Sequence, residues 1–262
     1  MKQVLTIILA LMFAGPVQAK LVTQTVAYHQ DGTVFEGYLA YDDLSRARRP
    51  GVLVVHEWWG LNDYAKERAR QLAALGYVAL AADMYGQGAV TRDPQEAAQW
   101  SGELKGKPQL RARAQAALKV LADNPLVDPR RLAAIGFCFG GTTVLELAYS
   151  GANLMGVVSF HGGLPLPQPG EMKRLKARIL VLHGADDPHV PPGEVAAWQA
   201  AMRQAGTDWQ MIFFGGAVHS FSNPAAGSDK ARGAAYDAPA ARRSWRYLRS
   251  FFQEMFPVRA RD

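Results

Sequence analysis

The segment LAAIGFCFGG at residues 132–141 holds the single cysteine of the chain, Cys138. Residues 132–137 form a continuous apolar run of strand length, and a helical pattern over residues 139–149 follows almost at once. Gly136 and Gly140 stand two positions before and two positions after Cys138. This spacing suits a turn so sharp that side chains flanking its central residue would collide. The segment therefore predicts a buried strand, a strained turn centred on Cys138, and a helix.

Cys138 stands where serine stands in the nucleophile elbow, G-x-S-x-G. The elbow aims its central side chain at the start of the following helix, where free N–H groups and the helix dipole favour a thiolate. A single cysteine cannot form an internal disulfide, so this thiol is either a small buried hydrophobe or a reactive group. The paired glycines favour the reactive group.

Outward from the elbow, apolar runs of strand length alternate with helical patterns. Further strands are expected at residues 51–56, 77–82, 155–160, 179–183 and 210–214. Helices are expected from Asn62 to Gly76 and at residues 94–104, 108–122, 192–205 and 239–256. Asp31-Gly32, between apolar-polar alternations at residues 21–28 and 34–41, predicts an antiparallel hairpin. The whole pattern predicts an α/β fold around a mostly parallel sheet.

An elbow also needs an acid and a base, which follow the nucleophile along the chain in that order. The loop after residues 179–183 contains G-x-x-D-x-x-V-P, in which Asp187 holds the acid position and Asp186 is the competitor. His219 follows the next strand, and the glycines at 215 and 216 let a short loop swing its imidazole toward Cys138. Ligands of open α/β sheets bind beyond the carboxyl ends of the strands, so we expect these side chains to meet there.

The other histidines fit the base position less well. His29 lies in the hairpin, His189 lies in the acid loop, and His183 ends a strand, where we expect it to hydrogen-bond to backbone. His161 opens a His-Gly-Gly sequence that resembles an oxyanion motif but lies after the elbow instead of before it. Asp187 and His189 are also conceivable metal ligands, and Asp187 a conceivable turn residue. No helical H-E-x-x-H or Cys/His pair accompanies them, so we expect no metal and no cofactor.

Length and composition indicate one globular domain after a targeting segment. The chain has 262 residues, of which 49% are hydrophobic and 20% charged, which excludes a disordered or disulfide-stapled protein. Lys2, the apolar run at residues 5–13 and the small-x-small sequence ending at Ala19 predict a signal peptide at residues 1–19, cleaved after Ala19. We therefore expect a domain at residues 20–262 of a periplasmic or secreted protein, with no stable membrane anchor after cleavage.

The formal net charge is +6, and many arginines lie between residues 242 and 261. They interleave with Trp245, Leu248 and Phe252 at helical spacing, which is typical of the solvated face of a terminal helix. No base-reading motif is present, so no nucleic-acid partner is expected. We expect a monomer.

Residues 55–62, VHEWWGLN, residues 83–85, DMY, and the Cys138 elbow together resemble the dienelactone hydrolase family of α/β-hydrolases. The resemblance spans residues 22–256. It implies an α/β-hydrolase fold, with a mostly parallel sheet of about eight strands, an antiparallel N-terminal hairpin, helices on both faces and no large cap domain. It also assigns Cys138, Asp187 and His219 as a catalytic triad.

The same resemblance implies roles for the loop after residues 51–56. Glu57 would contact the resting thiol and help couple its ionisation to substrate binding, and the backbone N–H groups of Trp58 and Phe139 would form the oxyanion hole. Independently of the family, a carboxylate at the end of a buried strand is costly unless partnered. We therefore expect a proton donor beside Glu57.

The sequence departs from the dienelactone enzymes at two positions. Those enzymes hold the substrate carboxylate with one arginine after Asp-x-Tyr and another shortly after the triad histidine, where this chain has Gln87 and Asn223. Both can donate hydrogen bonds but carry no charge to pair with an anion, so dienelactone itself is not expected as substrate. Four aromatic side chains instead predict a binding pocket for a neutral or apolar acyl group. They are Trp58, Trp59, Tyr85 and Phe221.

The predicted reaction is hydrolysis of a small-molecule ester or lactone through a thioester of Cys138. A thiolate leaves more readily than an alkoxide, so activated acyl groups such as enol lactones, aryl esters and thioesters are favoured over alkyl esters and amides. Two other classes stay open. One is a secreted binding protein that kept the fold without catalysis. The other is a redox protein that uses Cys138 as a peroxide-sensitive thiol.

Overall fold

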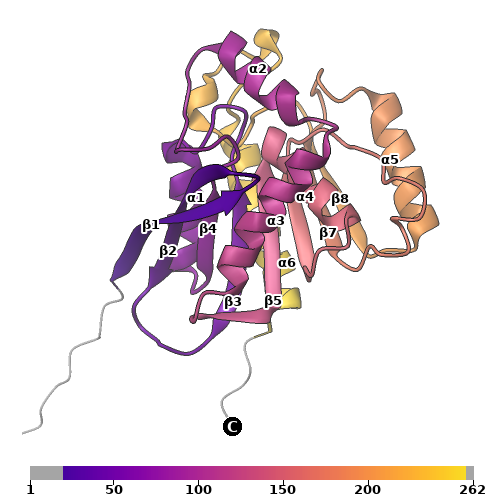
Figure 1. Cartoon of the computed structure of the whole chain (residues 1–262). Helices are drawn as coiled ribbons and strands as arrows, with labels where there is room; N and C mark the ends of the chain where they lie inside the picture. The colour runs from indigo at the N-terminus through magenta and orange to yellow at the C-terminus, as the bar shows by residue number, and fades with distance from the viewer. Residues whose placement is uncertain (1–19, 258–262) are drawn as a thin grey trace, which may run out of the picture.

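The structure is a computed structural model that describes residues 20–257. Its centre is an eight-stranded sheet with the order β1-β2-β4-β3-β5-β6-β7-β8 (Figure 1). The strands are β1 (Leu21–Gln30), β2 (Thr33–Asp42), β3 (Arg49–Val55), β4 (Val78–Ala82), β5 (Val127–Phe137), β6 (Gly156–Phe160), β7 (Arg178–Gly184) and β8 (Trp209–Phe214). The helices are α1 (Asp63–Ala74), α2 (Pro94–Leu104), α3 (Pro108–Ala122), α4 (Phe139–Tyr149), α5 (Pro192–Ala205) and α6 (Ala238–Met255), with short 3₁₀ turns at Pro224–Ala226 and Lys230–Arg232.

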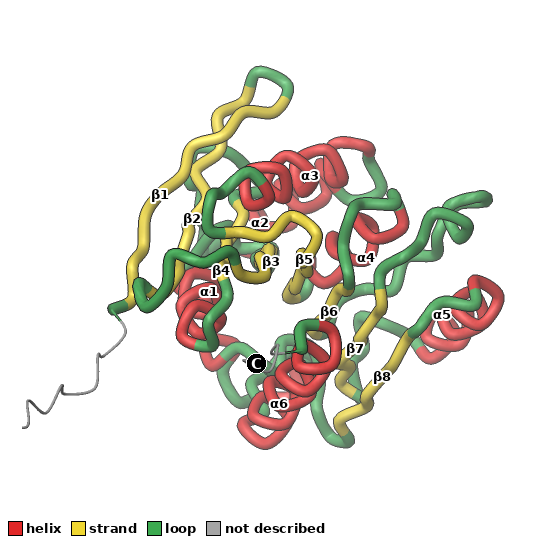
Figure 2. Tube along the Cα trace, turned by 90° about the horizontal axis from the view of Figure 1, so that it is seen from below, coloured by secondary structure: helices red, strands yellow, loops and turns green. Residues whose placement is uncertain are grey.

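Strands β3 to β8 pair in parallel, and β3 to β7 are covered on both faces, as their continuous apolar sequences predict, whereas the edge strand β8 is partly exposed. Helices α1 and α6 cover one face, and α3, α4 and α5 cover the other (Figure 2). Each face has its own hydrophobic core, and every residue of β4 and β6 is buried. The predicted fold is confirmed.

The N-terminal hairpin is antiparallel and turns at Asp31 and Gly32, which both have positive φ, 49° and 75°. Positive φ at both central residues is the geometry of the tight hairpin turn that Asp-Gly favours. Strand β2 continues the sheet by pairing antiparallel with β4.

Most element bounds agree with the sequence to within two residues, and β5 is the exception. We expected this strand at residues 132–137, but it begins at Val127, where it pairs with Arg49 across a register shift. The Asp128-Pro129 pair is typical of a turn, but here it lies in an extended segment between the pairing of Val127 with Arg49 and that of Leu132 with Gly51.

The carboxyl ends of the parallel strands lie together beneath α2, at the opposite end of the molecule from both ends of the described chain (Figure 1). In residues 20–257, α2 is the only regular helix laid over these strand ends, and no large cap domain is present. None of the helices in this range is long and apolar enough to cross a bilayer. The predicted signal peptide, residues 1–19, lies outside the described residues.

Candidate active site

Cys138 lies at the tight turn between β5 and α4, with φ 53° and ψ −114°. A side chain at Gly136 would overlap the carbonyl oxygen of Gly140, and one at Gly140 would overlap that of Val55. Both glycines are therefore required by close backbone approach. A non-glycine residue at positive φ is strained and is often held so for function.

His219 and Asp187 meet at this turn. Nδ1 of His219 lies 2.8 Å from Oδ2 of Asp187, whose Oδ1 accepts the backbone N–H of His189 at 2.9 Å. The Asp187 side chain is fully buried, whereas Asp186 is exposed and its N–H donates to the carbonyl of Ala217. Asp187 is thus the carboxylate that orients His219, and Asp186 is not.

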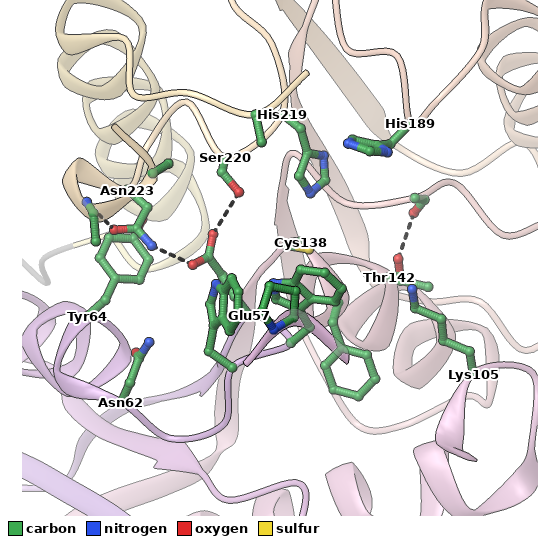
Figure 3. Close-up of a pocket in the computed structure, with 18 of the residues that line it drawn as sticks. Glu57, Asn62, Tyr64, Lys105, Cys138, Thr142, His189, His219, Ser220 and Asn223 are labelled. Atoms are coloured by element: carbon green, nitrogen blue, oxygen red, sulfur yellow. Dashed lines mark hydrogen bonds between the residues drawn. The ribbon is translucent and has the colours of Figure 1, made fainter. Parts of the chain in front are cut away.

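The imidazole of His219 points toward Cys138 (Figure 3). Burial alone would lower the pKa of His219, but the charge of Cys138 and the hydrogen bond and charge of Asp187 outweigh it and raise that pKa to about 10. Burial alone would raise the pKa of Asp187, and the hydrogen bond and charge of His219 lower it. The three groups therefore form one electrostatic unit of two acidic groups and one imidazolium.

The two residues whose backbone N–H groups were expected to form the oxyanion hole, Trp58 and Phe139, line the cavity together with Cys138. Phe139 is the first residue of α4, where helix N–H groups have no partner within the helix. Trp58 follows the end of β3, and Phe139 and Trp58 both line the cavity. The hydroxyl of Tyr85 donates to the Trp58 carbonyl at 3.0 Å and so holds the peptide that follows Trp58.

Glu57 is almost fully buried and accepts two hydrogen bonds from the loop that carries His219. Asn223 Nδ2 donates to Oε2 at 2.5 Å, and Ser220 Oγ donates to Oε1 at 3.1 Å (Figure 3). Burial raises the pKa of Glu57 more than these two bonds lower it. The expected proton donor is present, and the hydrogen bonds of Glu57 within residues 20–257 go to Asn223 and Ser220 and not to the thiol that it was expected to contact. The loop that carries His219 supplies both hydrogen-bond donors to the Glu57 carboxylate.

A second set of polar side chains, not expected from the sequence, lies under the elbow. The backbone N–H of Cys138 points at His161 Nδ1, 3.1 Å away, and at the Phe160 carbonyl, 3.0 Å away. His161 Nε2 lies 2.7 Å from Ser222 Oγ, which lies 2.7 Å from the hydroxyl of Tyr64. The rule that ligands gather at the carboxyl ends of strands could have found His161, which directly follows β6.

The cavity at these strand ends has a volume of about 1230 Å³. Of the predicted pocket residues, Trp58, Trp59 and Asn223 line it together with Cys138 and His219. Charged side chains also line it, which the expected pocket for a neutral or apolar group did not include. They are Asp63, Lys66, Arg92, Lys105, Glu146, Glu194 and Arg232, besides Glu57.

Three predicted pocket residues are not in the cavity lining. Phe221 is fully buried and packs against His161 and Phe214. Tyr85 packs behind Trp58, and Gln87 is exposed on the hairpin side, where its N–H donates to the carbonyl of Val34. Nearness in sequence to a strand end did not fix where these side chains point.

The sequence model of the dienelactone hydrolase family matches residues 35–256. The chain belongs to the dienelactone hydrolase family. It is 45% identical to a solved protein named m3DLH, with a TM-score of 0.87, over 90% of this chain and 99% of that one. A solved dienelactone hydrolase-like promiscuous phosphotriesterase from metagenomic libraries is also 45% identical, with a TM-score of 0.86 and coverage of 90% and 99%. Protein usf of Aquifex pyrophilus is 27% identical over 88% of this chain and 98% of its own.

This dienelactone hydrolase family member uses Asn223 as a structural partner. Its Nδ2 donates to Glu57, and its Oδ1 accepts the N–H of Ala225 at 2.9 Å. The amide therefore has bonds at both ends before any substrate arrives.

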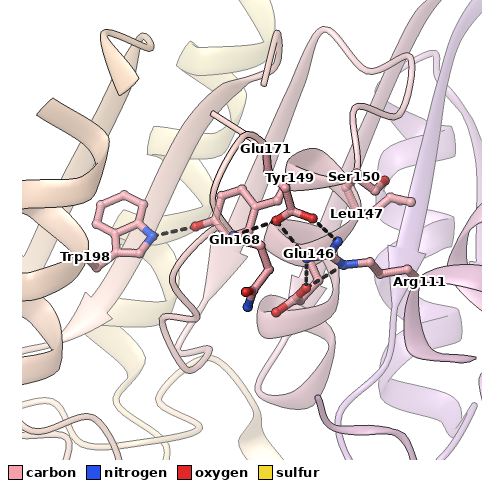
Figure 4. A network of polar contacts seen from close by, with 8 residues as sticks. All are labelled: Arg111, Glu146, Leu147, Tyr149, Ser150, Gln168, Glu171 and Trp198. Atoms are coloured by element: carbon pink, nitrogen blue, oxygen red, sulfur yellow. Dashed lines mark hydrogen bonds and ion pairs between the residues drawn. The ribbon is translucent and has the colours of Figure 1, made fainter. Parts of the chain in front are cut away.

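An ion-pair network holds one wall of the cavity in place. Arg111 of α3 pairs with Glu146 of α4 and with Glu171 of the loop between β6 and β7 (Figure 4). The guanidinium donates to both carboxylates, at 2.6 Å to Glu146 and 2.5 and 3.2 Å to Glu171. The loop that Glu171 anchors also supplies Leu164 and Pro165 to the cavity, so the network fixes the shape of this wall.

His183 is a correction to the sequence prediction. We expected it to bond to backbone, but its Nδ1 is buried without a hydrogen-bond partner among residues 20–257. It packs edge-on against Phe213, with ring centroids 5.4 Å apart. In this same range, no three His, Cys, Asp or Glu side chains converge as metal ligands would.

Proposed function

We propose that this protein hydrolyses activated carboxylic esters or lactones with Cys138 as nucleophile, His219 as acid and base, and Asp187 as the orienting carboxylate. The observation that carries the proposal is the imidazole of His219, held by Asp187 at 2.8 Å and facing a cysteine on a strained elbow. The grouping of nucleophile, base and orienting acid is what covalent acyl transfer requires.

The thiolate sulfur attacks the carbonyl carbon, and the electrons of the C=O bond move to oxygen. The N–H groups of Trp58 and Phe139 donate to this oxyanion. As it collapses, the bond to the leaving group breaks, His219 gives that group its proton, and a thioester of Cys138 remains. Water then loses a proton to His219 and attacks the thioester, which releases the carboxylic acid and regenerates the Cys138 and His219 pair.

Hydrolysis of p-nitrophenyl acetate by wild type and by Cys138→Ala tests the proposal. We expect turnover in wild type, inhibition by iodoacetamide, and loss of turnover in the variant. Unchanged turnover in Cys138→Ala would refute the role of the thiol. A protein that binds esters without turnover would be a binding protein, and persistent sulfenic acid after peroxide without esterase activity would indicate a redox protein.

A second candidate activity is slow hydrolysis of phosphotriesters with an aryl leaving group. The relative named as a promiscuous phosphotriesterase is 45% identical and spans 90% of this chain. A P=O oxygen fits the same pair of N–H donors as a carbonyl oxygen. Release of p-nitrophenol from diethyl p-nitrophenyl phosphate, lost in Cys138→Ala, would support this activity, and no release above the variant would exclude it.

The proposed compartment is the periplasm or the cell exterior, and it rests on the signal-like residues 1–19. Expression with and without these residues, followed by fractionation, tests it. Export that does not depend on residues 1–19 would contradict the proposal.

A further inference from the structure

The protonation of His161 follows from its neighbours. The backbone N–H of Cys138 is shared between the Phe160 carbonyl at 3.0 Å and Nδ1 of His161 at 3.1 Å, so Nδ1 acts as an acceptor and is the unprotonated nitrogen. In a neutral imidazole the proton is then on Nε2, which donates to Ser222 Oγ at 2.7 Å. A second proton, on Nδ1, would face the N–H of Cys138. The hydrogen bonds therefore require one neutral tautomer.

The same contacts join three segments that are distant in the chain. His161 touches the elbow at Cys138, Ser222 belongs to the loop of His219, and Tyr64 belongs to α1. Arg68 of α1 completes the set by donating to the Tyr64 hydroxyl at 3.3 Å and to the Ser222 carbonyl at 2.9 Å. Nucleophile and base are thus tied to each other through His161, independently of substrate.

His161 is also held in an unusual backbone position. It is fully buried with φ 40°, and its N–H donates to the Leu182 carbonyl at 2.9 Å. A histidine at positive φ is uncommon, and such strain persists only where the surroundings over-determine it. A glycine would relieve the backbone strain but would leave the N–H of Cys138 and Ser222 without the imidazole.

The charges that face His161 favour its neutral form. His219 lies against it with ring centroids 5.3 Å apart, and Arg68 and His183 are the other cationic or titratable neighbours. Burial, with the positive charge of His219, lowers the pKa of His161 well below its usual range. The side chain is therefore uncharged next to a histidine that carries a charge.

We propose that His161 is a positioning residue for the reaction: its neutral imidazole holds the elbow N–H of Cys138 with Nδ1 and the His219 loop with Nε2–H, and so sets the spacing of nucleophile and base. This inference rests on the proposed function for its effect on turnover, but the hold on Cys138 exists without it.

Two conservative variants separate the two bonds. In His161→Asn the side-chain amide reaches about as far as Nδ1 and can accept from Cys138 N–H, whereas in His161→Gln it reaches about as far as Nε2 and can donate to Ser222. His161→Phe removes both bonds and keeps a ring. His29→Phe, on an exposed position of β1, is the control for a lost imidazole far from the site.

For p-nitrophenyl acetate we expect kcat/KM to fall about 100-fold in His161→Phe, with smaller losses in Asn and Gln, and no change in the control. The pH midpoint of Cys138 alkylation by iodoacetamide should rise by about one unit in His161→Phe and less in His161→Asn, because a loosened elbow supports the thiolate less well. If His161 had a structural role alone, the variants would have lower unfolding temperatures, but their kcat/KM values and alkylation midpoints would not follow this order.

The inference is overturned if His161→Phe folds and keeps both its activity and its alkylation profile. If His161→Phe does not fold, equal activity and equal alkylation midpoints of His161→Asn, His161→Gln and wild type overturn it. Absence of esterase activity in wild type, with the alkylation midpoints still ordered as expected, would remove the proposed function and leave the positioning role in place.

Discussion

Cys138 lies between two histidines that have opposite electrostatics. His219 follows β8 and His161 follows β6, and their rings lie 5.3 Å apart. Burial opposes a charge on both, yet the pKa of His219 rises to about 10 while that of His161 falls well below its usual range. The difference comes from their partners, because His219 faces the carboxylate of Asp187 and the thiol, and His161 faces a backbone N–H and a hydroxyl.

One side of Cys138 is therefore built from paired charges and the other from neutral donors and acceptors. Glu57 belongs to the second side, since its carboxylate is held by Asn223 and Ser220 and by no cation within hydrogen-bond distance among residues 20–257. Burial does not determine protonation by itself. For His219 the neighbouring charges and hydrogen bonds outweigh burial, whereas burial is the largest influence on the pKa of His161 and of Glu57.

The substitution Asp187→Asn removes the carboxylate that pairs with His219 and should have the largest effect. An amide cannot stabilise the imidazolium of His219, and kcat/KM for p-nitrophenyl acetate should fall by about 10³ to 10⁴, as for other triads that lose the carboxylate. Asp186→Asn, at the neighbouring exposed position, is the matched control and should be unaffected. Activity of Asp187→Asn close to that of the control would contradict the pairing.

The substitution Asn223→Asp removes the uncharged amide that donates to Glu57. This change places a second carboxylate against Glu57, where the amide now lies at 2.5 Å, and should lower the free energy of unfolding by about 2–3 kcal/mol at pH 7 in urea titrations. Asn62→Asp is the control, because Asn62 lines the same cavity and caps α1, and aspartate caps a helix equally well. Equal stability of the two variants would mean that Glu57 is not anionic or not desolvated.

The pH dependence of stability tests the charge on His219. The pKa of His219 is about 10 in the folded protein and 6.5 in the unfolded chain. Its contribution to the free energy of unfolding is therefore complete below about pH 6.5 and is lost as the pH rises through about 10. Cys138→Ala removes the largest cause that raises this pKa, so the unfolding temperature of the variant should decline less, by about a few degrees, between pH 7 and 10. Parallel wild-type and variant curves would argue against the ion pair.

The smallest effect is expected for Gln87→Arg, which adds a charge away from both His219 and His161. Because Gln87 is exposed and absent from the cavity lining, the ratio of kcat/KM for an anionic and a neutral p-nitrophenyl ester should stay within about twofold of wild type. Thr142→Lys, which adds a cation to the lining, is the positive control. A strong shift toward the anionic ester in Gln87→Arg would place position 87 at the substrate.

Local sequence was sufficient to predict a structural feature wherever that feature depends on residues of a single segment. The glycines around Cys138 predict the elbow because overlap with the backbone depends on a few neighbouring residues. Sequence order alone also placed Asp187 and His219 at strand ends that the parallel sheet brings together. The same reasoning failed for Tyr85, Gln87 and Phe221, since side-chain direction after a strand depends on packing against other segments.

Local sequence is enough to predict the alternation of strands and helices, the strained turn at Cys138 and the order of nucleophile, acid and base, because each depends on periodicity, chain order or steric overlap between near neighbours. Three features emerge only from the packed fold: His161 lies under the elbow, Asn223 faces Glu57, and the pKa of His219 rises while that of His161 falls. These properties depend on electrostatic interactions and hydrogen bonds between loops that are far apart in the chain, and no local sequence pattern encodes them.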